Sequence, residues 1–242
     1  MTPDLIRKAV AEAVGTALLV LAVIGSGIAA SQLSGDIGLQ LLENAMATAG
    51  ALVAIILAVG PVSGAHLNPV VTLADRVFGA MGTFDAVVYC GAQVIGGAVG
   101  AVVANVMFSL PAVELSTHAR SSGALWTSEI VATFGLLLVI FGVVRSGRTA
   151  VAPFAVAAYI GGAYFFTSST SFANPAVTLA RTLSDTFAGI APASVPAFVL
   201  AQLIGAGLAI ALVRFLYPTV ADVASAVVVP HPTSEQETCV RQ

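Results

Sequence analysis

Two segments of the chain begin with an asparagine and a proline and continue with almost the same residues. They are Asn68-Pro69-Val70-Val71-Thr72-Leu73-Ala74 and Asn174-Pro175-Ala176-Val177-Thr178-Leu179-Ala180. Asparagine is a good helix N-cap, and proline is favoured at the first helical position. Each segment therefore predicts a short helix, one from Pro69 to about Phe78 and one from Pro175 to about Leu183.

The chemistry of this pair follows from its amides and helix starts. A capping asparagine uses its side-chain oxygen for the backbone, which leaves the NH₂ group as a donor. If the two helices start from opposite sides, Asn68 and Asn174 meet and their NH₂ groups point into a shared lumen. Two positive dipole ends and two fixed donors favour a neutral solute with oxygen atoms and repel cations.

The composition identifies the environment of these helices. The chain is 58% hydrophobic and only 9% charged, whereas a soluble domain carries about 25% charged residues. A soluble enzyme, a secreted disulfide scaffold and a disordered regulator are therefore excluded. No basic tract is present for nucleic acid to bind, and Cys90 and Cys239 offer neither a disulfide nor a metal-ligand spacing, so we expect no cofactor and no metal.

Six apolar stretches are long enough to cross a hydrocarbon core about 30 Å thick. They are Lys8–Ala30, Leu39–Val59, Ala86–Phe108, Trp126–Val144, Val151–Ser168 and Ser194–Tyr217. A helix of ten residues rises only about 15 Å, so the two Asn-Pro helices are half-helices that dip into the membrane and return. We expect a single domain over residues 1–216 and a mobile cytoplasmic tail over 217–242.

The basic residues predict the orientation, because cytoplasmic loops are enriched in lysine and arginine. With the N-terminus inside, Arg120 and Arg181 lie outside. The inner side then holds Arg7, Lys8, Arg76, Arg145, Arg148 and Arg214. This distribution favours cytoplasmic N- and C-termini in the inner (plasma) membrane.

The Asn-Pro segments belong to an internal repeat, with one copy over about 7–108 and the other over about 126–216. Glu12 in the first copy matches Glu129 in the second. Each copy holds three spans, so the copies cross the membrane in opposite senses and share a site near its middle. The predicted fold class is an all-α membrane protein, with six transmembrane helices and two re-entrant half-helices in an inverted 3+3 repeat.

At these residues the chain resembles the aquaporin and aquaglyceroporin (major intrinsic protein) channels. The resemblance rests on Ser63-Gly64-Ala65-His66-Leu67-Asn68-Pro69-Val70 and on Phe172-Ala173-Asn174-Pro175-Ala176. It implies one pore per subunit, a homotetramer and a pore constriction at Asn68, Pro69, Val70, Asn174, Pro175 and Ala176. In its filter region the chain is similar to bacterial channels associated with arsenic resistance.

Two departures from the family pattern bear on selectivity. The first Asn-Pro box, Asn68-Pro69-Val70, ends in valine where the family usually has alanine. This change leaves the cap chemistry intact. The larger change is Val177, where the family normally has a filter arginine. Counting along the family pattern, the remaining filter positions are Thr48, Gly162 and Ser171. A filter of small, uncharged side chains predicts a wide, weakly polar pore without an arginine.

Several neighbouring residues have two possible roles. Glu12 and Glu129 are proton-relay candidates by chemistry, but the resemblance implies anchors that accept hydrogen bonds from the re-entrant loops. His66 either lines the pore or satisfies buried carbonyl groups. Arg181 is either a displaced guard in the outer vestibule or a partner of the half-helix end or of Asp185. Phe172 lies near the filter, where packing and lining are both possible.

Together these features predict a passive channel, not an enzyme, for small neutral solutes with accompanying water. The expected cargo is glycerol-like polyols, urea and undissociated arsenite or other metalloid hydroxides. The expected partners are these solutes, water, the lipid bilayer and further copies of the chain. The alternatives are an ion- or proton-coupled secondary transporter, which also uses inverted repeats and broken helices, and a mainly water-conducting aquaporin.

Overall fold

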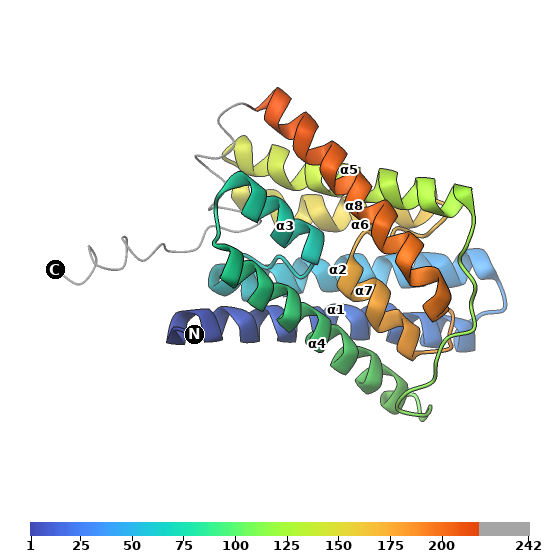
Figure 1. The fold of residues 1–242 in the computed structure, drawn as a ribbon. Helices are drawn as coiled ribbons and strands as arrows, with labels where there is room; N and C mark the ends of the chain where they lie inside the picture. The colour runs from blue at the N-terminus through green and yellow to red at the C-terminus, as the bar shows by residue number, and fades with distance from the viewer. Residues whose placement is uncertain (218–242) are drawn as a thin grey trace.

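The computed structural model describes residues 1–217, and this part of the chain consists of helices and loops without a β-strand (Figure 1). The α-helices are α1 (Pro3–Leu33), α2 (Ile37–Ser63), α3 (Pro69–Phe78), α4 (Thr83–Met107), α5 (Gly123–Arg145), α6 (Ala152–Phe166), α7 (Pro175–Ala180) and α8 (Val195–Leu216). Short 3₁₀ turns are η1 (Thr149–Val151), η2 (Arg181–Leu183) and η3 (Pro192–Ser194). The predicted tail lies, from residue 218 onward, outside the described residues.

Six of the helices in this part of the chain are long and apolar enough to cross a membrane: α1, α2, α4, α5, α8, and α6 together with η1. The spans begin earlier than the apolar runs predicted where a polar cap precedes them. Thr2 accepts a hydrogen bond from Leu5 N at the start of α1, and Asp36 accepts one from Leu39 N at the start of α2. The caps therefore extend these helices at their N-terminal ends.

The two halves of the bundle repeat the same packing. In the first half α1 packs on α4, and in the second half α5 packs on α8. A Cβ atom at Gly96 would collide with the carbonyl of Ala13, and one at Gly205 would collide with the carbonyl of Ile130. Glycine at these matched positions lets the paired helix backbones touch. The inverted 3+3 repeat predicted from the sequence is confirmed by this fold.

The half-helices α3 and α7 occupy opposite halves of the bundle (Figure 1). The half that contains α3 also contains the N-terminus, and the half that contains α7 also contains the connection between α4 and α5. The second half-helix ends as α-helix at Ala180 and continues as the 3₁₀ turn η2 to Leu183, where the prediction had placed its end. The two helix starts therefore face each other inside the protein.

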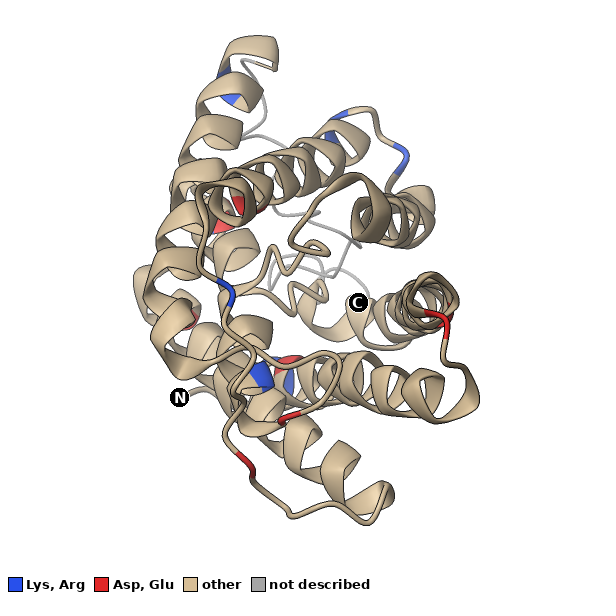
Figure 2. Ribbon diagram, turned by 90° about the vertical axis from the view of Figure 1, so that its right-hand side faces the viewer, with Lys and Arg blue, Asp and Glu red and all other residues tan. Residues whose placement is uncertain are grey.

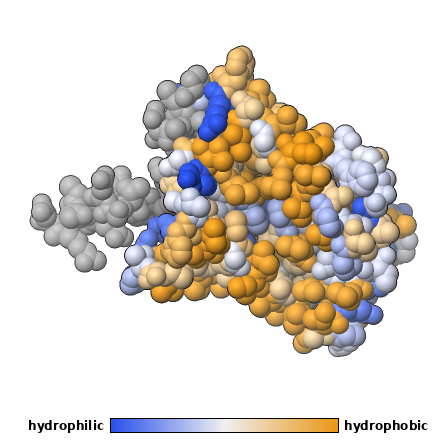
Figure 3. Space-filling view, in the orientation of Figure 1, coloured by the Kyte–Doolittle hydropathy of each residue, from blue (hydrophilic) through white to orange (hydrophobic). Residues whose placement is uncertain are grey.

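The surface matches a lipid environment. Apolar residues cover much of the face seen in Figure 3, and large apolar side chains such as Val87, Ile95 and Phe165 are exposed on the spans. Charged residues are sparse in the bundle, as Figure 2 shows. The chain is an integral membrane protein, and its buried interior is arranged around the two half-helices.

Candidate functional site

The loops that lead into the two half-helices share an unusual backbone. Ala65 and Leu67 have φ angles of 49° and 51°, and Ser171 and Ala173 have φ angles of 51° and 46°. Non-glycine residues adopt this left-handed region rarely, and it marks strained backbone that the surroundings must hold in place. The same alternation at equivalent positions indicates that both loops are built to present particular backbone groups.

Two buried carboxylates hold these loops. Glu12 on α1 accepts hydrogen bonds from the backbone of His66 (2.9 Å) and Leu67 (2.7 Å). Its other partners are the side chains of Ser63 and Gln93, both at 2.7 Å. Four donors on one carboxylate satisfy most of its acceptor sites.

Glu129 on α5 repeats this arrangement in the second half. It accepts from the backbone of Phe172 and Ala173, both at 2.9 Å, and from the side chains of Ser169 and Gln202, both at 2.6 Å. Neither Glu12 nor Glu129 lines the central cavity. This geometry is what the anchor interpretation requires, whereas a proton relay needs a carboxylate that the lumen can reach.

The anchored loops orient their carbonyl groups. In a trans peptide the C=O points away from the N–H of the same unit, and the described chain contains no cis peptide bond. The carbonyls of Ala65 and His66 therefore point away from Glu12, and those of Ser171 and Phe172 point away from Glu129. All four residues line the cavity, so each loop offers it a pair of acceptors.

Asn68 and Asn174 cap the half-helices, as the sequence predicts. Asn68 Oδ1 accepts from Val70 N at 3.1 Å, and Asn174 Oδ1 accepts from Ala176 N at 3.0 Å. The expectation that both NH₂ groups are wholly free is wrong. Asn68 Nδ2 donates to the Ala173 carbonyl at 2.8 Å, and Asn174 Nδ2 donates to the Leu67 carbonyl at 2.7 Å.

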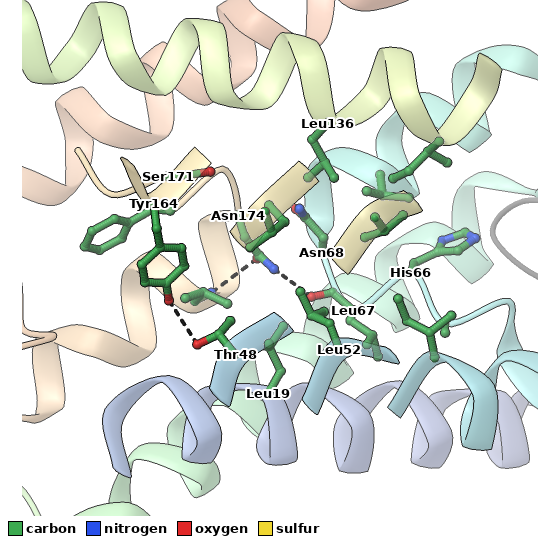
Figure 4. Close-up of a pocket in the computed structure, with 18 of the residues that line it drawn as sticks. Leu19, Thr48, Leu52, His66, Leu67, Asn68, Leu136, Tyr164, Ser171 and Asn174 are labelled. Atoms are coloured by element: carbon green, nitrogen blue, oxygen red, sulfur yellow. Dashed lines mark hydrogen bonds between the residues drawn. The ribbon is translucent and has the colours of Figure 1, made fainter. Parts of the chain in front are cut away.

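These two bonds join the halves at the centre of the protein. Each NH₂ group has two hydrogens, and one hydrogen on each amide has no partner among residues 1–217. Asn68 and Asn174 both line the cavity (Figure 4). Each amide thus fixes the geometry with one hydrogen and offers the other to the lumen.

A cavity of about 620 Å³, open in part to solvent, runs past these asparagines. Its lining residues are Leu19, Thr48, Leu52, Ile56, Ala65, His66, Leu67, Asn68, Val71, Leu136, Ile140, Val156, Ile160, Tyr164, Ser171, Phe172, Asn174, Val177 and Arg181. Many of its polar groups come from the two loops, with Thr48, Tyr164 and Arg181 added from α2, α6 and η2, and its apolar groups come mainly from the spans. The wall is therefore amphipathic.

Three of the four predicted filter residues lie in this cavity: Thr48, Ser171 and Val177. Ser171 is 4% exposed, and its hydroxyl has no hydrogen-bond partner among the described residues. Val177 is 5% exposed and places an apolar side chain where the family resemblance leads one to expect an arginine.

The fourth, Gly162, does not line the cavity, and the structure corrects this prediction. Val156, Ile160 and Tyr164 follow each other at four-residue spacing and share the inner face of α6. Gly162 falls halfway between the last two, on the opposite, exposed face. A count of positions along the family pattern does not report which face of α6 points inward, and Tyr164 occupies the inner position here.

Tyr164 adds an aromatic ring to the predicted filter. Its hydroxyl lies 3.1 Å from Thr48 Oγ1, and Figure 4 shows the two side chains meeting at one end of the cavity. The expectation of small side chains at every filter position is therefore wrong at this position.

Arg181 also lines the cavity and is only 3% exposed. Its guanidinium Cζ lies 3.4 Å from the centroid of the Phe172 ring, and its Nε donates to the carbonyl of Ala188. The suggested pairing with Asp185 is wrong, since that carboxylate binds the 116–118 segment instead. The pore has no arginine at position 177 but does have one at 181.

Asp185 ties the connection between α4 and α5 to the segment that follows η2. Its carboxylate accepts from Thr117 N at 2.8 Å and from Thr117 Oγ1 at 3.1 Å, and it lies 3.8 Å from His118 Nε2. The backbone hydrogen bond from Thr117 is the main cause that lowers the pKa of Asp185 below its ordinary value. The charged form of this residue therefore helps hold the loop over α7.

His66 and Phe172 both line the cavity. The His66 ring Nδ1 lies 3.1 Å from Thr72 Oγ1, and the ring is 5.3 Å from that of Tyr89. His66 thus both lines the space and satisfies a buried polar group. No group of three potential ligands for a metal ion occurs among the residues described.

The apolar wall of the cavity was not predicted from the sequence. Its members recur every fourth residue: Leu52 and Ile56 on α2, Leu136 and Ile140 on α5, and Val156 and Ile160 on α6. A lumen-facing stripe on a span that is apolar all round has little contrast with the lipid face. The signal that would have found it is the spacing of four from Thr48 on α2.

The chain is similar to known proteins in sequence and in structure. The model of the family described as "Major intrinsic protein" matches residues 1–171. Aquaglyceroporin AqpS of Rhizobium meliloti (strain 1021) is 49% identical over 213 residues, which cover 88% of this chain and 91% of that protein. Aquaporin NIP2-1 of Oryza sativa subsp. japonica is 33% identical over 78% of this chain and 64% of that protein.

The X-ray structure of the aquaglyceroporin from Plasmodium falciparum has the same fold, with a TM-score of 0.66 and 21% sequence identity over 89% of this chain and 98% of that chain. The two Asn-Pro segments in inverted register, the anchored loops and these similarities all indicate the same family. The chain belongs to the major intrinsic protein family.

Proposed function

We propose that this protein is a passive transmembrane channel, and not an enzyme, for small neutral solutes with accompanying water. The observation that carries the proposal is the central cavity, which holds the starts of both half-helices and the amides of Asn68 and Asn174. Positive dipole ends and fixed donors favour solute oxygen atoms. The cargo class is glycerol-like polyols, urea and undissociated arsenite or other metalloid hydroxides.

The amphipathic wall supports solutes larger than water. Carbonyl groups of the two loops and the asparagine amides offer hydrogen bonds along one part of the cavity, while the stripes on α2, α5 and α6 are apolar. A polyol presents hydroxyl groups on one side and carbon on the other, so it matches both surfaces. The name of the relative from Rhizobium meliloti, an aquaglyceroporin, supports the same class.

The channel unit that we propose is residues 1–216, with repeats over about 7–108 and about 126–216. The N- and C-termini are placed in the cytoplasm, the protein in the inner (plasma) membrane, and the functional state is a homotetramer. The supporting observations are the distribution of basic residues and the family membership.

A coupled transporter fits the site less well. Alternating access requires one half to rock against the other, and such a motion breaks the bonds from Asn68 to Ala173 and from Asn174 to Leu67. Glu12 and Glu129, the carboxylates suited to proton coupling, each hold four donors and lie outside the cavity lining.

A mainly water-conducting channel is the second candidate, and two residues favour it. Tyr164 and Arg181 bring a ring and a charge to a region that was expected to hold small, uncharged side chains. The ring of Tyr164 takes up space that a larger solute would need, and the charge of Arg181 adds a polar group to the lining.

Stopped-flow measurements on protein-containing liposomes separate the candidates. Glycerol, urea and arsenite are each compared with water and with empty liposomes, with and without a protonophore. Passage of glycerol or arsenite well above the empty vesicles supports the proposal. Passage of water with every larger solute excluded favours the second candidate, and saturable flux that a protonophore abolishes identifies a coupled transporter.

A further inference from the structure

The outer end of the cavity contains an arginine that is not paired with an acid. Arg181 is 3% exposed, and no acidic side chain among residues 1–217 forms a salt bridge with it. A buried charge without a counter-ion is unfavourable. The surrounding residues must therefore fix it in place, and its position calls for a functional explanation.

Two contacts fix the guanidinium. Its Cζ lies over the Phe172 ring, 3.4 Å from the centroid, and Nε donates to the carbonyl of Ala188. Arginine stacked on an aromatic face gains from the ring's negative surface. The four hydrogens on its two Nη atoms have no hydrogen-bond partner within residues 1–217. Since Arg181 lines the cavity, these donors are available to it.

A second cation lies against the same ring. Arg120, from the connection before α5, has its Cζ 5.2 Å from the Phe172 centroid, and its Nε donates to the Gly189 carbonyl at 2.8 Å. The nearby carboxylate of Glu129 already accepts four hydrogen bonds. Two arginines thus lie against Phe172 at this end of the cavity, and among the described residues neither forms a salt bridge with Glu129 or with another acid, although Glu129 is close enough to act on both electrostatically.

We propose that Arg181 supplies the cation-excluding charge of this pore, one helical turn beyond Val177, with Phe172 as its positioning residue. This inference rests on the proposed channel function. At an effective dielectric of 20, a unit charge about 10 Å away disfavours a monovalent cation by roughly tenfold to twentyfold. Arg120, whose Cζ lies 5.2 Å from the same ring centroid, adds to this potential.

The arrangement separates two tasks that a single arginine at position 177 would combine. The width of the pore is set by Thr48, Tyr164 and Val177, which are uncharged, and the sign of the excluded ions is set by Arg181. A change at the charge should therefore alter ion leakage without altering the size limit for neutral solutes. A change at Tyr164 should alter the size limit for neutral solutes without altering ion leakage.

The test uses the full-length protein in liposomes, with proton and sodium fluxes and glycerol flux measured on the same preparation. Arg181→Met removes the charge, and Arg181→Gln removes it while keeping an N–H donor for Ala188 if the first variant folds poorly. We expect either variant to raise the cation flux by about tenfold or more relative to the glycerol flux. Arg181→Lys keeps the charge and should remain close to the wild type.

Phe172→Leu tests the positioning role of Phe172. The ratio of cation flux to glycerol flux should rise in this variant, but less than in Arg181→Met. Arg148→Met, at an exposed arginine between α5 and η1, is the matched control and should leave the ratio unchanged. A folded Arg181→Met protein with wild-type cation exclusion overturns the inference while the proposed function stands. A wild-type protein that passes neither glycerol nor any other neutral solute overturns the proposed function, and the inference with it.

Discussion

The Asn174 side chain donates a hydrogen bond to the carbonyl oxygen of Leu67 across 2.7 Å, although the two residues are 107 positions apart. The reciprocal bond runs from Asn68 to Ala173. Each asparagine therefore caps its own half-helix and also ties the opposite loop. These two bonds connect the inverted repeat at the level where a solute would pass.

Replacing either asparagine by alanine should weaken folding and permeation together. The loss of an N-cap lowers the free energy of unfolding by about 1 kcal/mol, and the loss of the bond between the halves adds about 1 kcal/mol. Because the two sites are equivalent, Asn68→Ala and Asn174→Ala should give similar losses in thermal unfolding and in glycerol flux. A neutral result for one variant and a large loss for the other would contradict the equivalence.

Glu12→Gln should reduce the yield of folded protein more than it changes selectivity. Four donors converge on the carboxylate, and an amide presents its own N–H groups to some of them. Breaking a buried, charged network of this kind costs about 3 kcal/mol. The measurement is the yield of monodisperse protein beside the glycerol-to-water flux ratio. A normal yield of monodisperse protein with an altered glycerol-to-water flux ratio would contradict the anchor interpretation.

Tyr164→Ala should raise the size limit of the pore, since it removes an aromatic side chain from the cavity lining. Polyols longer than glycerol should then pass at rates closer to that of glycerol. Gly162→Ala is the matched control, because a Cβ there would meet only Phe166, at an ordinary distance of 3.7 Å. If Gly162→Ala changed the size limit and Tyr164→Ala did not, our assignment of the α6 filter position would be reversed.

Asp185→Asn should remove a pH-dependent part of the stability. The pKa of Asp185 is lowered in the folded protein, so its contribution is present above its unfolded pKa of about 3.9 and is lost as the pH falls through the folded value. The wild type should unfold at a higher temperature than the variant at pH 6. This difference in unfolding temperature should disappear at the acid end of the range. An equal difference at pH 6 and at pH 3 would show that the charge of Asp185 is not its cause.

Much of the fold was predictable because it depends on features that recur locally in the chain. The Asn-Pro pairs specify helix starts by cap chemistry, and the length of the apolar runs specifies the spans. Three spans in each copy then require the inverted arrangement. The helix ends were less predictable, as with Pro3 at the start of α1, where capping by Thr2 extends the helix.

The site residues that lie in or next to the Asn-Pro segments were predictable. A residue farther along a helix was less predictable, because its place depends on which face of that helix points inward. Asn68, Asn174, Ser171 and Val177 follow from the boxes. Tyr164 was missed because its place on the inner face of α6 follows from the packing of that helix, which a count of positions along the sequence does not report. The contact between Arg181 and Phe172 depends on how η2 turns after Ala180, which no local pattern specifies.

The bonds that cross between the halves also have a consequence for biosynthesis. The carbonyl that Asn68 binds belongs to Ala173, 105 residues later in the chain. At a synthesis rate of about 5–20 residues per second, roughly 5 to 20 seconds separate the two residues. During that interval the Asn68 side chain at the start of α3 lacks the carbonyl to which it donates in the folded protein. The nascent first half must therefore wait, shielded by its own spans or by the insertion machinery, until its partner emerges.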